Sequence, residues 1–114
     1  MNNRKSGIEG ENIAVEYLKK QGYLILERNF NTKVGEIDII AQDKDTIVFV
    51  EVKARENTKF GQPIENITSK KVHSIIRTAQ WYLSSKRKYD SLCRFDVIEV
   101  LRGEVTHTKN AFTM

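Results

Sequence analysis

The sequence has little of several residue types that mark specialised classes of protein. Its 114 residues include one Cys, one Pro and six Gly. The single cysteine, Cys93, cannot form an internal disulfide, which argues against a disulfide-stabilised secreted domain. The scarcity of Pro and Gly excludes a low-complexity or collagen-like chain. No apolar run is long enough for a membrane helix or a signal-peptide core, so we expect a cytoplasmic protein without a membrane partner.

The charges are nearly balanced in sign. There are 19 Lys and Arg residues against 15 Asp and Glu residues, which gives a formal net charge of +4. This mild basic bias is compatible with a polyanionic partner and also with many ordinary globular proteins. Hydrophobic residues make up 39% of the chain and charged residues 30%, which suits one modest core. We therefore expect a single domain over residues 1–114.

The spacing of the apolar residues predicts the element order α-β-β-β-α-β-β. Apolar residues recur at helical spacing over residues 6–21, where Ser6 is the expected N-cap, and again from Thr68 or Ser69 to about 86–88. Strand-forming residues occupy 23–29, 36–41, 46–53, 93–101 and 105–108, and residues 54–66 read as a loop. Strands 36–41 and 46–53 are apolar on both faces, a pattern typical of a central mixed sheet flanked by helices. The expected fold class is α/β.

Three charged residues interrupt these apolar strands. They are Asp38, Glu51 and Lys53, and each costs several kcal/mol to bury unless it is paired or binds a metal. Glu51 and Lys53 share one face of their strand, about 6–7 Å apart. If the hairpin places Asp38 beside Glu51, two carboxylates meet next to an ammonium group, as in a divalent-cation site. The alternative is a buried ion pair that fixes the register of the sheet.

Glu11 lies within the apolar stripe of the first predicted helix. It follows Ile8 by three residues and precedes Val15 by four, which aims its side chain at the sheet. Gly7 and Gly10 would let the helix backbone approach the sheet closely. Glu11 therefore predicts a third carboxylate at the same site. The alternative is an exposed carboxylate that is favourable near the helix N-terminus.

The segment Gly35-Glu36-Ile37-Asp38, followed by Glu51-Val52-Lys53, resembles the PD-(D/E)xK motif of restriction-endonuclease-like nucleases. Ile37 stands where that motif has proline. A closer resemblance covers nearly the whole chain and is to the YraN-like family of small bacterial endonuclease-like proteins, which is similar in its motifs to archaeal Holliday junction resolvases. The segments that carry it are Gly10-Glu11, Tyr17-Leu18, Gly22-Tyr23, Arg28-Asn29, Gly35–Asp38, Val48–Lys53 and Arg94–Val97.

This resemblance implies a restriction-endonuclease-like core and a nuclease that hydrolyses phosphodiester bonds in DNA, with branched or structured DNA as one substrate class. Asp38, Glu51 and Glu11 would hold Mg²⁺ or Mn²⁺, with the Val52 carbonyl as a further ligand. Lys53 would orient the attacking water or stabilise developing negative charge. Glu11, Asp38, Glu51 and Lys53 are thus the expected catalytic residues, and a homodimer would allow two strands to be cut symmetrically.

Two other functional hypotheses are compatible with the sequence. One is a non-catalytic nucleic-acid-binding module that keeps the nuclease fold, and the other is a metal-stabilised interaction protein without a nucleic-acid partner.

Cations near the acids are the expected contacts to nucleic-acid phosphates. These are Arg55, Lys59, Lys70 and Lys71, each of which could instead be a solvated surface charge. His73 and His107 are isolated and are expected at the surface or in turns, so hard cations are favoured over zinc. Trp81 lies off the apolar stripe of the second helix, where it could stack on a base, form a dimer contact or cover the sheet edge.

Overall fold

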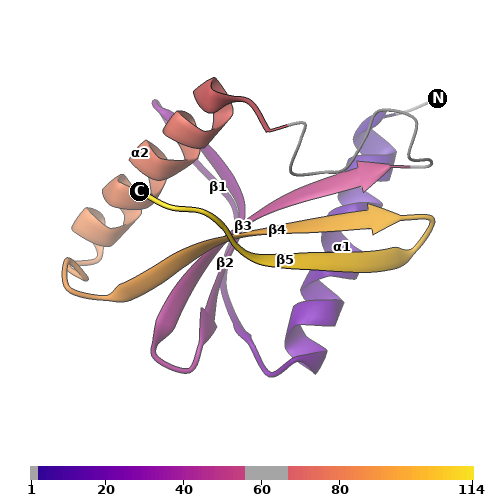
Figure 1. Ribbon diagram of the computed structural model, residues 1–114, viewed down its shortest axis with the longest axis horizontal. Helices are drawn as coiled ribbons and strands as arrows, with labels where there is room; N and C mark the ends of the chain where they lie inside the picture. Colours follow the sequence, from indigo (N-terminus) through magenta and orange to yellow (C-terminus); the bar gives the residue numbers. More distant parts are fainter. Residues whose placement is uncertain (1–2, 56–66) are drawn as a thin grey trace.

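A computed structural model describes residues 3–55 and 67–114, with side chains from residue 7 onward. The elements are α1 (Asn3–Lys20), β1 (Leu24–Thr32), β2 (Gly35–Asp43), β3 (Thr46–Arg55), α2 (Ser69–Ser85), β4 (Leu92–Leu101) and β5 (Glu104–Phe112). The predicted α-β-β-β-α-β-β order is confirmed. The strands form one five-stranded sheet in the order β1-β2-β3-β4-β5 (Figure 1). Strands β3 and β4 are parallel, and α2 lies in the connection between them, as a parallel pair requires.

The two helices cover opposite faces of the sheet (Figure 1). On one face, α1 packs on a cluster that includes Ala14, Leu18, Ile39, Val50 and Ile98. On the other, α2 packs on a cluster that includes Ile40, Phe49, Ile75, Tyr82 and Phe95. The central strands are therefore buried on both sides, which confirms the interpretation of their continuous apolar runs. No helix in the described part of the chain is long and apolar enough to cross a membrane.

Several element boundaries differ from the predicted ones. The first helix begins at Asn3, so the prediction of Ser6 as its N-cap is wrong, and Ile8 is 52% exposed rather than inward. Strand β1 continues past its predicted end at residue 29 to Thr32, because Thr32 pairs with Gly35 of β2. Strand β5 likewise runs to Phe112 rather than 108. In both edge strands, pairing with a neighbouring strand outweighs the turn preference of Asn, Thr and Lys.

A polar network on the α1 face connects β4 to β5. Asp96 is fully buried and accepts hydrogen bonds from Arg94 Nε (3.0 Å) and the main-chain N–H of Asn110 (3.0 Å). His107 Nε2 lies 2.7 Å from Asp96 Oδ2, and His107 Nδ1 lies 3.0 Å from the Tyr17 hydroxyl. The network satisfies a carboxylate that has no access to water.

The prediction that His107 lies at the surface or in a turn is wrong. It lies in the middle of β5, paired in register with Ile98, and its side chain is 5% exposed. The pairing register with β4 is the cause, because it turns the imidazole toward Asp96 beneath α1. His73 is exposed on α2, as predicted.

Candidate active site

The candidate site lies where β2 and β3 separate. Their antiparallel ladder ends at the pair Ile39 and Val50. Asp38 and Glu51 come next in register, just beyond that end. Asp38 Oδ2 accepts a hydrogen bond from the main-chain N–H of Val52 at 2.8 Å. A carboxylate thus takes the place of a main-chain partner, and this contact holds Asp38 against β3.

Glu51 is buried beside Asp38. Its side chain is 5% exposed. Burial, the nearby charge of Asp38 and a hydrogen bond with that carboxyl group raise the pKa of Glu51 to about 7, against the opposing effect of Lys71 and Lys53. The proximity of the Asp38 carboxylate makes ionisation of Glu51 costly, so near neutral pH a large share of the Glu51 side chains keep their proton. The structure therefore brings together the two acids that the sequence predicted to meet.

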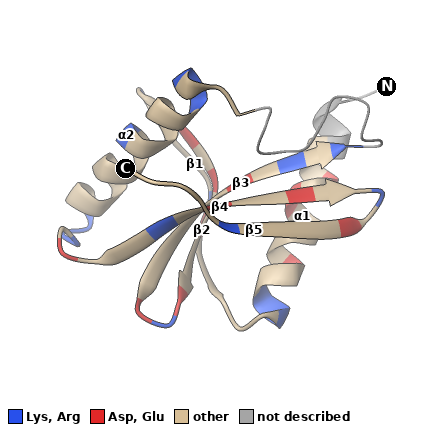
Figure 2. Cartoon of the chain, in the orientation of Figure 1, with Lys and Arg blue, Asp and Glu red and all other residues tan. Residues whose placement is uncertain are grey.

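Two lysines approach Glu51 from different elements. Lys53 Nζ, on β3, and Lys71 Nζ, in the first turn of α2, each lie 3.6 Å from Glu51 Oε2. Lys53 is 31% exposed and Lys71 is 37% exposed. The predicted proximity of Glu51 and Lys53 is confirmed. Figure 2 shows the basic residues at the end of β3 and at the start of α2.

Glu11 faces the same region from α1. Burial raises the pKa of Glu11, and the charges of Asp38 and Glu36 add to this effect. A hydrogen bond from Asn29 and the charge of Arg28 lower it in part. The charge of Asp38 acts on Glu11 from across the gap between α1 and the sheet, and α1 lies on the opposite face of the sheet to α2.

Gly10 allows α1 to approach β3 closely. A Cβ atom at Gly10 would lie 2.5 Å from Ala54 Cβ, whereas one at Gly7 would meet nothing within 4 Å. Gly10→Ala is therefore expected to destabilise the protein by about 1–3 kcal/mol through overpacking. Gly7→Ala is the matched control and should be neutral or stabilising, because Ala favours helix. Urea denaturation measures both, and equal free energies of unfolding would contradict the close approach.

The donor set suits a hard cation. Asp38 and Glu51 supply carboxylate oxygens, the ligands that Mg²⁺ prefers, and Mg²⁺ commonly binds through one or two carboxylates and keeps several waters. Within the described ranges, no three His, Cys, Asp or Glu side chains are grouped closely enough to hold a metal ion. The residues present therefore fit a two-carboxylate site completed by water or substrate oxygens. Glu11 stays a predicted ligand.

The predicted nucleic-acid contacts have different surroundings. Arg55 is 13% exposed, and its Nε lies 3.4 Å from Oε2 of buried Glu99. Lys59 lies outside the described residues. Lys70 is exposed on α2, while Lys71 pairs with Glu51. Contact with phosphates stays a prediction for all of them.

Sequence reasoning missed Glu99. It is 4% exposed on β4, next in register to Lys53 and paired with Arg55. A charged residue within the apolar run 97–101 was the available signal, but its partner could not be identified before the parallel register of β3 and β4 was known.

The raised pKa of Glu51 predicts a pH-dependent stability. The folded protein keeps a proton that the unfolded chain releases above its ordinary pKa of about 4.5, so this stabilisation is lost as the pH rises through about 7. In metal-free buffer, Glu51→Gln should match the wild type near pH 4 and exceed it by about 1–3 kcal/mol near pH 9. Urea denaturation at both pH values is the measurement. A difference that stays constant with pH would contradict the close carboxyl pair.

The fold and the site together define an α/β domain in which a buried glutamate, a partly buried aspartate and two lysines meet at the separated end of the central strands. The chain belongs to the uncharacterised protein family UPF0102, whose model matches residues 10–100. It is 51% identical over 108 residues to a UPF0102 protein of Persephonella marina, covering 95% of this chain and 93% of that protein. It is 48% identical over 114 residues to one from Clostridioides difficile, covering 98% and 100% respectively.

Proposed function

We propose that the protein is a metal-dependent nuclease that hydrolyses phosphodiester bonds in DNA. The observation that carries this proposal is the cluster at the separated ends of β2 and β3, where buried Glu51 meets Asp38 and Lys53. In the PD-(D/E)xK resemblance, Asp38 is the first acid, Glu51 is the second acid and Lys53 is the lysine. The helix, three-strand, helix, two-strand order agrees with the restriction-endonuclease-like core that the same resemblance implies.

Asp38 and Glu51 would hold Mg²⁺ or Mn²⁺. A bound divalent ion supplies Lewis-acid chemistry, which activates water and offsets charge on the phosphate. The hydrogen bond from the Val52 N–H orients the Asp38 carboxylate, and burial keeps the Glu51 side chain in one place. Lys53, at 3.6 Å from Glu51, brings an ammonium group to the edge of the pair, where it can stabilise negative charge on the phosphate.

A nucleic-acid-binding module without turnover is the second candidate. The observation that favours it is that three metal-ligating side chains do not converge anywhere in residues 7–55 and 67–114. Against it, an acid pair that repels phosphate is unfavourable for binding alone. The two candidates differ in whether the phosphodiester bond is broken.

The test is cleavage of end-labelled linear, flapped and four-way-junction DNA in Mg²⁺ or Mn²⁺. We expect cleavage that requires the ion and is absent with Glu51→Gln, which keeps the size of the side chain and removes its charge. The ranking of the three substrates identifies the preferred DNA structure. Salt-sensitive binding without cleavage in either ion would overturn the nuclease proposal and support the binding module.

A further inference from the structure

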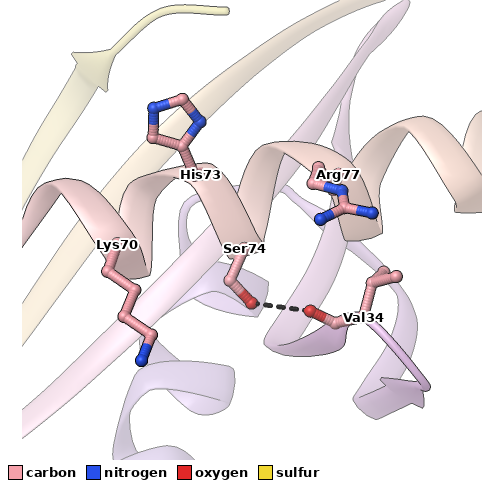
Figure 3. Close-up of a pocket in the computed structure, with 5 residues that line it drawn as sticks. All are labelled: Val34, Lys70, His73, Ser74 and Arg77. Atoms are coloured by element: carbon pink, nitrogen blue, oxygen red, sulfur yellow. Dashed lines mark hydrogen bonds between the residues drawn. The ribbon is translucent and has the colours of Figure 1, made fainter.

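A groove runs between α2 and the turn that joins β1 to β2. It encloses about 540 Å³ and is lined by Val34, Lys70, His73, Ser74 and Arg77. We call it the α2 groove. Figure 3 shows Ser74 pointing from the helix to the Val34 carbonyl, with Lys70 and Arg77 to either side along α2. The Ser74 hydroxyl donates a hydrogen bond to that carbonyl at 3.0 Å.

The wall of the groove is fixed in place. The Thr32 hydroxyl accepts a hydrogen bond from the Val34 N–H at 3.2 Å and lies 3.1 Å from the Gly35 carbonyl, to which it donates. A Cβ atom at Gly35 would overlap the Ser74 hydroxyl, so the turn contacts α2 directly. The groove is therefore a preformed feature, and a ligand would not have to order it.

The cations of the α2 groove are available to a ligand. Lys70 and Arg77 are exposed, as is Lys33 in the adjoining turn. Over the described residues, none of these three forms an ion pair. Lys71, the next residue after Lys70, turns toward Glu51 instead. The first turn of α2 thus joins the groove to the candidate active site.

An exposed aromatic side chain continues the line of cations. Residues 70, 74, 77 and 81 recur at helical spacing, so Trp81 lies on the same stripe as Lys70 and Arg77. Trp81 is 54% exposed, and its ring centroid is 6.0 Å from that of Phe30 on β1. From Lys70 to Trp81 the stripe is about 16 Å long, which corresponds to about five nucleotides of one strand at about 3.4 Å each.

We propose that the α2 groove binds the backbone of a nucleic-acid strand outside the candidate active site, with an unpaired base stacked on Trp81. Lys70 and Arg77 contact phosphates, and Trp81 supplies a stacking surface that accepts any base. A line of exposed cations that ends in an exposed aromatic ring suits nucleic acid better than an acidic peptide, which has no bases to stack. The choice of ligand rests on the proposed function, but binding here does not require cleavage.

The intrinsic fluorescence of Trp81 provides the test, because it is the only tryptophan in the chain. The full chain is titrated, without divalent ions, with a single-stranded oligothymidylate of about 10 nucleotides, long enough to span the stripe. Poly-L-glutamate serves as the anion without bases. We expect the oligonucleotide to quench Trp81, and poly-L-glutamate to leave its fluorescence unchanged.

Variants separate the contributions of charge and stacking. Arg77→Ala should weaken oligonucleotide binding several-fold and make the slope of log K against log salt shallower by about 0.7. Lys20→Ala, an exposed lysine at the far end of α1, is the matched control and should change neither. Trp81→Leu should weaken binding of a fluorescein-labelled oligonucleotide about 10-fold, and Trp81→Phe should restore part of it.

Binding that leaves Trp81 fluorescence unchanged would overturn the inference, as would equal effects of Arg77→Ala and Lys20→Ala. Quenching by poly-L-glutamate to the same extent would assign the groove to anions in general and would also overturn it. These outcomes are independent of the nuclease proposal. A protein that cleaves DNA without quenching fails only this inference, and one that quenches without cleaving fails only the proposed function.

Discussion

Asp38→Asn is expected to lower the rate of metal-dependent DNA cleavage by about 1,000-fold or more. The neutral amide keeps the shape of the side chain but is a poor ligand for a hard cation, and several kcal/mol of transition-state stabilisation is lost with the ion. The Val52 N–H still finds an oxygen acceptor in the amide, so the fold should persist. Single-turnover cleavage measures the rate, and circular dichroism verifies the fold.

The two lysines beside Glu51 offer a matched comparison. Both ammonium groups lie 3.6 Å from Glu51 Oε2, but Lys53 comes from β3 and Lys71 from α2. Lys53→Met should reduce kcat by about 100-fold or more, as removal of one transition-state charge stabiliser does. Lys71→Met should mainly weaken DNA binding.

Two outcomes would contradict these roles. One is an equal loss of kcat in the two lysine variants, and the other is wild-type activity in Asp38→Asn.

Asp96→Ala is expected to destabilise the folded protein by about 3–5 kcal/mol, the usual cost of removing one partner from a buried ion pair. Asp96 is fully buried. Burial opposes its ionisation, but hydrogen bonds from His107, Arg94 and the Asn110 N–H outweigh burial and lower the pKa of Asp96. Because folded domains are stable by only about 5–15 kcal/mol, the loss is a large share of the total.

The lowered pKa of Asp96 also fixes the direction of its pH dependence. Its contribution to stability is present above the unfolded pKa and is lost as the pH falls through the lower folded value. Urea denaturation of Asp96→Ala should therefore show a large deficit near pH 7 that shrinks on acidification. Asp90→Ala, an exposed acid before β4, is the control and should change stability by less than about 0.5 kcal/mol. Equal effects of the two substitutions would contradict the network.

Much of the fold was predictable because the signals were local. Alternation along 46–53 placed Glu51 and Lys53 on one face, and helical spacing of apolar residues predicted both helices. The polar ends of β1 and β5 were not predicted. Pairing with β2 and β4 sets where these strands end, and such pairing leaves no apolar pattern in the local sequence. His107 was misassigned for the same reason, because its buried partner Asp96 is known only from the β4–β5 register.

The candidate site was predictable in its acids and less so in its cations. The hairpin of β2 and β3 fixes the opposition of Asp38 and Glu51 within a short stretch of chain. By contrast, the approach of Lys71 to Glu51 depends on how α2 packs across the sheet. The pairing of Arg55 with Glu99 depends on the parallel register of distant strands. Contacts of this kind produce no characteristic spacing of residues in the sequence, so the sequence alone does not predict them.

The proposed nuclease activity requires above all that Asp38 and Glu51 hold a divalent ion, and Mn²⁺ binding measures this directly. Electron paramagnetic resonance measures the concentration of free Mn²⁺ as protein is added. The experiment needs neither DNA nor catalytic turnover. We predict saturable binding by the wild type that strengthens as the pH rises through about 7, where Glu51 loses its proton. Glu51→Gln should lose this binding. Wild-type protein that leaves Mn²⁺ free, or binds it no better than Glu51→Gln, would contradict a divalent-ion site at Asp38 and Glu51.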